Sequence, residues 1–228
     1  MSSVSASGHL SASGRKKTPH FALKLFGSAA ILIVAVLFVL KYVFRYYLHY
    51  SQAGFNDFAA PNYWPMRGWL LMHITAGMVA LLTGPWQFWT GFRARYVRLH
   101  RWTGRVFLSS VAVGALCAYR MAAGTTFGWG FGFGLGVLAS AWLTTAAMAY
   151  YAILRRRIQI HKEWMVRTYV VTFAFVTFRV LTEYGPTSHL RPYDDLMVTA
   201  TWASWVLPLL ATEVILQLRR MRSPGLSN

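Results

Sequence analysis

Residues 127–154 read FGWGFGFGLGVLASAWLTTAAMAYYAIL and decide the fold, because the stretch contains no charged side chain. It exceeds the roughly 20 residues that a helix needs to cross a bilayer. Backbone amides cannot stay unpaired in hydrocarbon, so a spanning segment is either a helix or a strand of a closed barrel. Barrel strands are about ten residues long and alternate in polarity, whereas this run is continuously apolar. The stretch therefore predicts a membrane-spanning helix.

Similar apolar runs lie on both sides of this stretch. We predict three helices before it, over residues 25–48, 68–89 and 102–120, and two after it, over 164–184 and 196–218. The composition agrees, since 56% of the residues are hydrophobic and only 13% are charged, against about 25% charged in soluble domains. The sequence thus predicts an all-α integral membrane bundle of about six transmembrane helices.

Basic residues predict the orientation of the bundle. Most of the 23 Lys and Arg residues lie in one alternating set of segments, namely the two tails and the connections that precede the third and fifth helices. Because short segments rich in Lys and Arg stay in the cytoplasm, both termini are expected there. The expected organisation is a disordered basic cytoplasmic tail over 1–24, a six-helix membrane domain over 25–218 and a cytoplasmic tail over 219–228.

The net charge of +17 would suggest a nucleic-acid partner if the protein were soluble. Here the arginines flank membrane helices, so we expect them to contact anionic lipid headgroups at the cytoplasmic face, and we expect no nucleic acid. The one cysteine, Cys117, lies in an apolar run and is expected to be a buried small side chain. The sequence contains no disulfide framework and no CxxCH haem-attachment motif.

His73 is the first candidate for chemistry. It lies near the start of the second predicted helix, and Gly77, Ala80 and Gly84 follow it at helical spacing. An ionisable side chain inside a membrane usually faces the bundle interior and marks a functional site. A packing role, in which the imidazole bonds to a neighbouring helix, would explain the same pattern.

Two similar segments at the cytoplasmic starts of helices carry the next candidates. Each has a histidine, then a tryptophan and then an arginine, over His100 to Arg105 and over His161 to Arg167. Neutral imidazole at such a position can ligate haem iron. Arg101, Arg105 and Arg167 could bind haem propionates through bidentate contacts. The alternative is that Trp and Arg anchor the helices at the lipid headgroups.

Three further charged residues lie within predicted helices. Arg179 and Glu183 are four residues apart in the fifth helix, where they can pair. Glu213 is a lone acid inside the sixth helix, where it could be a proton-relay group or bond to an arginine of the inner side. With His73 these three residues form a candidate substrate or proton site. The fourth helix also carries a stripe of small residues, which predicts close approach of a neighbouring helix or a flat ligand. The stripe consists of Gly128, Gly132, Gly136, Ser140 and Thr144.

Short motifs are spread over about residues 65–215. They are His73-Ile74 with Gly77, the run from Ala80 to Pro85 with Gln87-Phe88, the segment from His100 to Arg105, Trp142, and His161 with Trp164-Met165 and Arg167. This set resembles an uncharacterised bacterial family of predicted multi-helix membrane proteins of unknown function. The resemblance implies a multi-pass protein of the bacterial inner (cytoplasmic) membrane. The sequence departs from the family pattern at Val206 to Leu209, where an Asn-Leu pair is expected upstream of Glu213.

A looser similarity is to transmembrane two-haem b-type cytochromes, in which four consecutive helices each supply one histidine. On that pattern His73, His100 and His161 match the first, second and fourth ligands, whereas the helix over 127–154 contains no histidine. The similarity implies one haem b near the cytoplasmic face, ligated by His100 and His161.

Three functions are compatible with these residues. The leading hypothesis is a membrane oxidoreductase that transfers electrons through this haem, with His73 at an outer quinone or proton site and a quinone or another redox protein as partner. The second is a carrier or channel for a small molecule or lipid, without a cofactor, in a glycine-striped cleft between the second and fourth helices. Its polar lining would be His73, Arg179, Glu183 and Glu213. The third is a membrane scaffold or assembly protein.

Overall fold

The computed structural model describes residues 19–48, 50–51, 53, 64–184 and 193–222, and every regular element within these ranges is a helix. The elements are α1 (Pro19–Phe38), the π-helical turn η1 (Val39–Val43), α2 (Phe44–Leu48), α4 (Arg67–Phe88), α5 (Thr90–Arg95), α6 (Val97–Ala123), α7 (Gly128–Leu154), α8 (Ile158–Thr172), α9 (Ala174–Tyr184) and α10 (Tyr193–Met221). The predicted all-α fold is confirmed.

Within the described residues, five segments are long and apolar enough to cross a membrane. They are α4, α6, α7, α8 together with α9, and α10. One further rod is formed by α1, η1 and α2, and it includes the shorter apolar stretch Ala29–Tyr42. These six segments correspond to the six helices expected from the apolar runs.

Three helices begin five or six residues earlier than predicted. α6 starts at Val97 and α8 at Ile158, ahead of the apolar runs at 102 and 164. Likewise α1 begins at Pro19, inside the segment that was assigned to a tail. Charged side chains end an apolar run but not a helix, because Arg and Lys are good helix formers whose long side chains reach toward water. As a result, the predicted haem ligands His100 and His161 both lie in the first turn of a helix.

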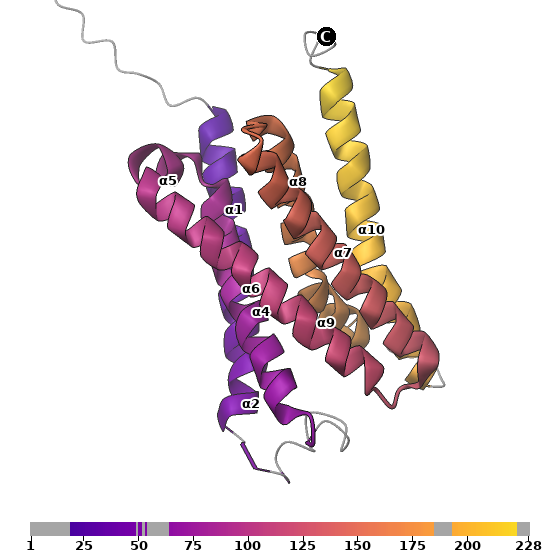
Figure 1. The fold of residues 1–228 in the computed structure, drawn as a ribbon. Coiled ribbons are helices and arrows are strands. Elements are labelled where there is room, and N and C mark those ends of the chain that lie inside the picture. Colours follow the sequence, from indigo (N-terminus) through magenta and orange to yellow (C-terminus); the bar gives the residue numbers. More distant parts are fainter. Residues whose placement is uncertain (1–18, 49, 52, 54–63, 185–192, 223–228) are drawn as a thin grey trace, which may run out of the picture.

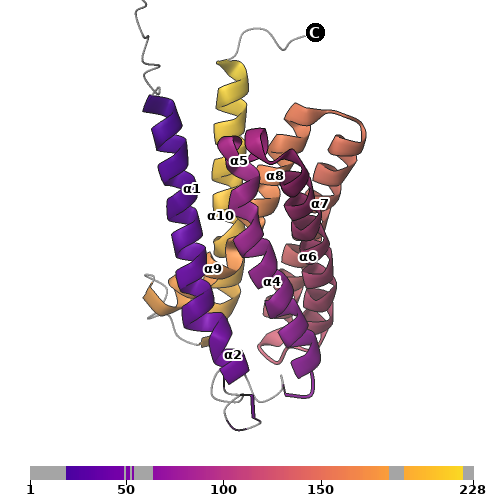
Figure 2. The same ribbon diagram turned by 90° about the vertical axis from the view of Figure 1, so that its left-hand side faces the viewer.

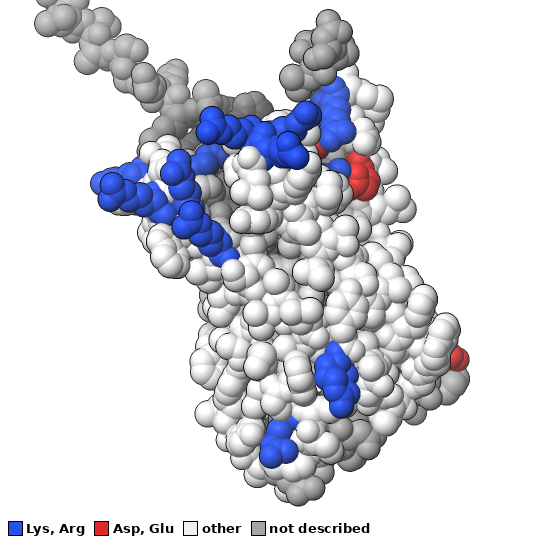
Figure 3. Space-filling view, in the orientation of Figure 1, with Lys and Arg blue, Asp and Glu red and all other residues white. Residues whose placement is uncertain are grey.

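The start of α1 and the end of α10 lie at the same end of the bundle, together with α5 and the turn between α7 and α8 (Figure 1). Lys and Arg side chains gather over this end in the space-filling view (Figure 3). We call it the basic end, and the other the opposite end. Among the described residues, the basic stretches that begin α6 and α8 and end α10 therefore lie at one end of the bundle. α4 begins at the opposite end and finishes at the basic end.

The core lies between α4, α6, α7 and α8. Phe107 and Val111 of α6 are fully buried there, against the rings of Trp142 and Tyr169. Close packing depends on glycine at one point, because a Cβ at Gly84 of α4 would lie 2.0 Å from the Tyr169 ring. α1 lies outside this core, alongside α4 (Figure 2).

Candidate functional site

A cavity of about 260 Å³ lies inside the half of the bundle at the opposite end. Its walls come from the C-terminal end of α6, the N-terminal halves of α7 and α10, parts of α4, α8 and α9, and Phe38 of α1. Most of the lining side chains are aliphatic or aromatic. The polar ones among the described residues are His73, Thr172, Arg179, Thr201 and Ser204.

One face of α4 forms a wall of this cavity. The residues of that face recur at helical spacing, as expected for one side of a helix. Gly77 lies in the middle of the face, and a Cβ added there would meet no atom within 4 Å. The glycine therefore leaves open a space that a larger side chain would occupy. The face consists of Leu70, His73, Ile74, Gly77, Met78 and Leu81.

His73 is held in position by three neighbouring helices. Its Nδ1 lies 2.8 Å from the carbonyl oxygen of Gly114 on α6. Its ring packs edge-on against Trp142 of α7, with ring centres 6.3 Å apart. Gly114 permits this arrangement, because a Cβ there would lie 2.8 Å from the Trp142 ring. Trp142 is fixed in turn by its Nε1, which donates to Thr172 Oγ1 of α8 at 2.8 Å.

The wall formed by α7 is its aromatic and aliphatic face, which includes Phe131, Leu138 and Trp142. None of the five residues of the small-residue stripe lines the cavity. Gly132 of that stripe instead packs against the end of α6, where a Cβ would lie 2.8 Å from the carbonyl oxygen of Ala122. The cavity thus lies against a different face of α7 from the glycine-striped cleft that the sequence suggested.

Arg179 reaches the same cavity from α9. Its guanidinium lies over two aromatic rings, 5.6 Å from the centre of Phe175 and 5.8 Å from the centre of Tyr42. Such contacts stabilise a cation through the electron-rich face of the ring. The structure therefore brings together two members of the predicted substrate or proton site, His73 and Arg179.

Glu183, the third predicted member, lies beside the cavity and contacts the first helical rod. It accepts a hydrogen bond from the Tyr42 hydroxyl at 2.5 Å and lies 3.5 Å from Lys41 Nζ. Next to these contacts, Phe38 lines the cavity and packs edge-on against Phe175, with ring centres 5.9 Å apart. The first rod is thus joined to α9 along one side of the cavity.

Every lining residue except Phe38 falls within one match to a known family. Residues 70–216 match a family described as predicted membrane protein (DUF2306). The chain belongs to this family. The match covers more than half of the chain and confirms the resemblance expected over about residues 65–215, and the family has no established function. No curated protein and no solved structure matches the chain.

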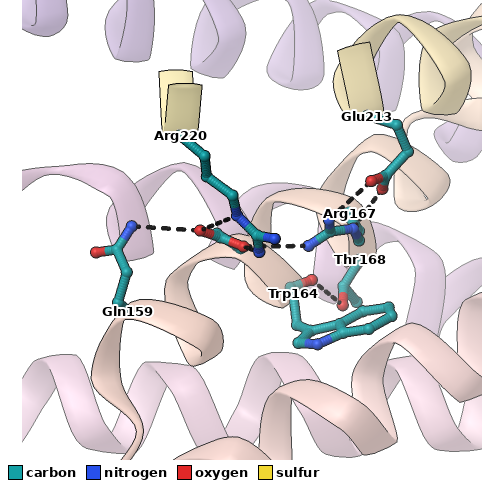
Figure 4. A network of polar contacts seen from close by, with 7 residues as sticks. Gln159, Trp164, Arg167, Thr168, Glu213 and Arg220 are labelled. Carbon is teal, nitrogen blue, oxygen red and sulfur yellow. Dashed lines mark hydrogen bonds and ion pairs between the residues drawn. The ribbon is translucent and has the colours of Figure 1, made fainter. Parts of the chain in front are cut away.

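At the basic end of this DUF2306 protein, a network of charged side chains joins α8 to α10 (Figure 4). Arg167 is at its centre. Its Nη2 donates to Glu213 Oε2 at 2.8 Å, its Nε donates to Oε1 of the same carboxylate, and its Nη1 lies 3.9 Å from Glu163. Arg220 donates to Glu163 through Nη2 and Nε. The side chains of Arg167 and Glu163 are only 9% and 8% exposed, so the central charges are buried and matched.

This network gives Glu213 an arginine partner, one of the two roles expected for it, and gives Arg167 neighbours that were not expected. Glu213 was grouped with His73 but lies at the basic end, and Arg167 is held by carboxylates where the haem hypothesis placed a propionate. Sequence reasoning missed Glu163 and Arg220. A signal was present, since Glu163 precedes Arg167 by four residues and Arg220 follows Glu213 by seven. Both spacings place two side chains on one face of a helix.

The two histidines predicted as haem ligands also lie at the basic end. His161 Nδ1 lies 2.8 Å from the carbonyl oxygen of Ala149. His100 Nδ1 is buried and has no hydrogen-bond partner within the described part of the chain. Arg101 and Arg105, the expected propionate partners beside His100, are exposed. Neither histidine lines the cavity, and no group of three or more metal-ligating side chains occurs among the described residues.

Proposed function

We propose that this protein is a carrier that binds a small, mostly apolar molecule within the membrane, in the cavity beside His73. The observation that supports this proposal is the cavity itself, about 260 Å³ of space walled by apolar side chains with an oriented imidazole at its edge. Ligand sites have this composition, in which a few fixed polar groups interrupt an apolar wall. A bundle that only had to be stable would fill such a space, because a void removes dispersion contacts from its lining.

Gly77 gives the proposal a second support. Glycine inside a helix is about 1 kcal/mol less favourable than alanine, and no neighbour within 4 Å requires it at this position. Close helix packing, which explains Gly84 and Gly114, therefore does not explain Gly77. Gly77 lines the cavity, so a larger side chain at this position would occupy cavity space.

We propose further that the basic end faces the cytoplasm of a bacterial inner membrane. Short segments rich in Lys and Arg remain on that side, and the arginines would then contact anionic lipid headgroups. In this orientation the cavity lies in the half of the bilayer that is remote from the cytoplasm, and His73 is reached from that leaflet.

Photolabelling of the protein in lipid nanodiscs tests the binding site. The probe is trifluoromethyl phenyl diazirine, an apolar photoreactive molecule, and mass spectrometry locates the labelled residues. We expect labelling of Phe131 and Trp142 in the cavity, beside the background labelling of exposed residues such as Leu207. Gly77→Leu should reduce the cavity labelling several-fold and leave the background unchanged, because the new side chain occupies the space.

Gly68→Leu is the matched control. Gly68 lies on the same helix, also meets no atom within 4 Å of an added Cβ, and does not line the cavity. This variant should label like the wild type. Equal cavity labelling in Gly77→Leu and Gly68→Leu, or no labelling of the cavity residues in the wild type, would count against the carrier.

A second candidate function is electron transfer through one haem b between His100 and His161. The observation that favours it is the state of the two imidazoles. His161 donates from Nδ1 to a backbone carbonyl, as iron- and zinc-bound histidines do, and His100 keeps a buried nitrogen without a partner in the described chain. A bound haem would supply one-electron chemistry, and the exposed Arg101 and Arg105 could hold its propionates, whereas Arg167 is already engaged by carboxylates.

An absorption spectrum of the protein purified in mild detergent, before and after dithionite, tests this second function. A b-type cytochrome shows a sharp Soret band and a reduced α-band that both disappear in His100→Ala and His161→Ala. His73→Ala serves as the control, because it lies at the cavity and should leave the spectrum unchanged. A colourless, folded protein obtained from haem-replete cells would remove electron transfer from consideration.

A further inference from the structure

The polar groups around the cavity determine which ligand it can bind. We infer that the ligand is a neutral hydroxyl compound, an alcohol or phenol with an apolar body, whose O–H donates a hydrogen bond to His73 Nε2. The inference rests on the proposed function, since it names the ligand class of the same cavity. Most polar groups of the lining can only accept a further hydrogen bond, because their own protons are already donated within the protein.

The neighbour of His73 fixes the tautomer of its imidazole. A backbone carbonyl can only accept a hydrogen bond, so the 2.8 Å contact between Nδ1 and the Gly114 oxygen places the proton on Nδ1. In neutral histidine the other ring nitrogen, Nε2, then carries a lone pair and no proton. Within the described residues the imidazole forms its hydrogen bond through Nδ1, and Nε2 has no hydrogen-bond partner there. His73 thus presents a hydrogen-bond acceptor to the cavity.

The three hydroxyl groups of the lining have already used their protons. Thr172 Oγ1 donates to the Thr168 carbonyl oxygen at 2.8 Å, Thr201 Oγ1 donates to that of Met197 at 2.7 Å, and Ser204 Oγ donates to that of Thr201 at 2.8 Å. Each oxygen therefore keeps only lone pairs for any further partner. The one indole N–H of the described wall, that of Trp142, already donates to Thr172 Oγ1.

Charge narrows the ligand class further. Among the described residues that line the cavity there is no carboxylate, so a cationic donor such as an ammonium group would lie in an apolar site without a counter-charge. Burial of an unpaired charge is far more costly than burial of a neutral hydroxyl. Arg179 is the one cation of the described lining, and it lies against the Phe175 and Tyr42 rings. A ligand that only accepts hydrogen bonds would leave Nε2 of His73 unpaired.

The experiment compares two probes, one with a hydroxyl group that can donate a hydrogen bond and one in which a methyl group replaces that proton. 4-Phenylphenol and its methyl ether compete with the diazirine for the cavity of the nanodisc-embedded protein, and labelling of Phe131 and Trp142 is the readout. We expect the phenol to compete about tenfold better per molecule in the bilayer than the ether, the value of one hydrogen bond. Labelling of Leu207, which is 62% exposed, corrects for how much of each probe enters the lipid.

His73→Asn removes the Nε2 acceptor but keeps a donor for the Gly114 carbonyl oxygen. The asparagine amide can still donate to the Gly114 carbonyl, and it is too short to replace Nε2. The preference for the phenol should fall to about one in this variant. If the variant does not fold, the wild-type preference decides alone.

The outcomes separate the two proposals. Equal competition by phenol and ether, with cavity labelling still lost in Gly77→Leu, overturns the hydroxyl class and leaves the carrier in place. If neither probe competes and Gly77→Leu does not change the labelling of the cavity, both the carrier and the hydroxyl class of ligand are overturned. A preference for the phenol that persists in His73→Asn overturns the role of Nε2.

Discussion

At the basic end of the bundle, buried charges are matched against one another, whereas in the opposite half the buried polar groups keep unused lone pairs around an open space. Arg167 directs its guanidinium nitrogens at two carboxylates. His73 lines the cavity and uses one ring nitrogen on Gly114, while the other has no hydrogen-bond partner within the described residues. The same kind of residue pattern, an ionisable side chain inside a membrane helix, thus serves stability in one half and is available for binding in the other.

The hydrogen-bond partners of an ionisable residue inside a membrane indicate whether it stabilises the bundle or is available for binding. Such residues are commonly taken as functional by default. Here the deciding property is whether the hydrogen-bonding capacity of the residue is used up by the protein. Glu213 has its capacity satisfied by Arg167, so it joins helices. His73 has capacity left over beside a void, so it is the candidate for ligand contact.

The largest effect should come from breaking the matched charges. Arg167→Met leaves the Glu213 carboxylate without its arginine and removes one of the two arginines beside the buried Glu163, and removal of one member of a buried pair costs about 3–5 kcal/mol. We expect that loss in the free energy of unfolding, measured by SDS titration. Adding Glu213→Gln should recover most of it, because Glu163 keeps Arg220 and no carboxylate of the network is left without an arginine. Arg98→Met, at an exposed position, is the control, and an equal loss there would contradict the assignment.

A smaller effect should distinguish the packed half from the hollow half at two glycines of α4. Gly84→Ala places a methyl group against the Tyr169 ring, and overpacking of this kind costs about 1–3 kcal/mol. Gly77→Ala meets no atom within 4 Å and should be neutral or stabilising by up to about 1 kcal/mol, the helix propensity gained. SDS titration of both variants checks the sign, and equal destabilisation at both positions would mean that Gly77 does not face open space.

Loss of a single buried hydrogen bond at the edge of the cavity should be smaller again. Trp142→Phe keeps most of the ring but removes the Nε1 donor to Thr172, at a cost of about 1 kcal/mol. The same variant should weaken probe binding, because the ring that packs against His73 is no longer fixed. Trp129→Phe, at a position that is 81% exposed, should change neither quantity.

The smallest effect is expected at the contact between the first rod and α9. Lys41 and Glu183 have side chains that are 53% and 33% exposed, and exposed ion pairs contribute little. Glu183→Gln should leave the unfolding curve unchanged, since the glutamine carbonyl can still accept from Tyr42. A marked loss of stability would show that this contact holds the rod in place more firmly than its exposure implies.

Part of the candidate site was predictable from local spacing. The position of His73 with Gly77 one turn later marked one wall of the cavity, because residues four apart share a helix face. The spacing could not reveal that Gly114 accepts from His73, since the two residues are 41 positions apart in the chain. The small-residue stripe on α7 was visible too, but its Gly132 packs on α6, and the cavity lies against the aromatic face of α7 instead. Which face of α7 lines the cavity depends on how the helices are rotated.

The sequence by itself determined that the chain is a bundle of apolar helices, roughly where each lies and which connections carry the positive charge. These properties are local, because about 20 apolar residues suffice to define a crossing. Only the tertiary structure decided which carboxylates meet Arg167, which half of the bundle is hollow and which nitrogen of His73 remains available. Those properties depend on contacts between helices distant in sequence, and hydropathy does not encode helix rotation or partner choice.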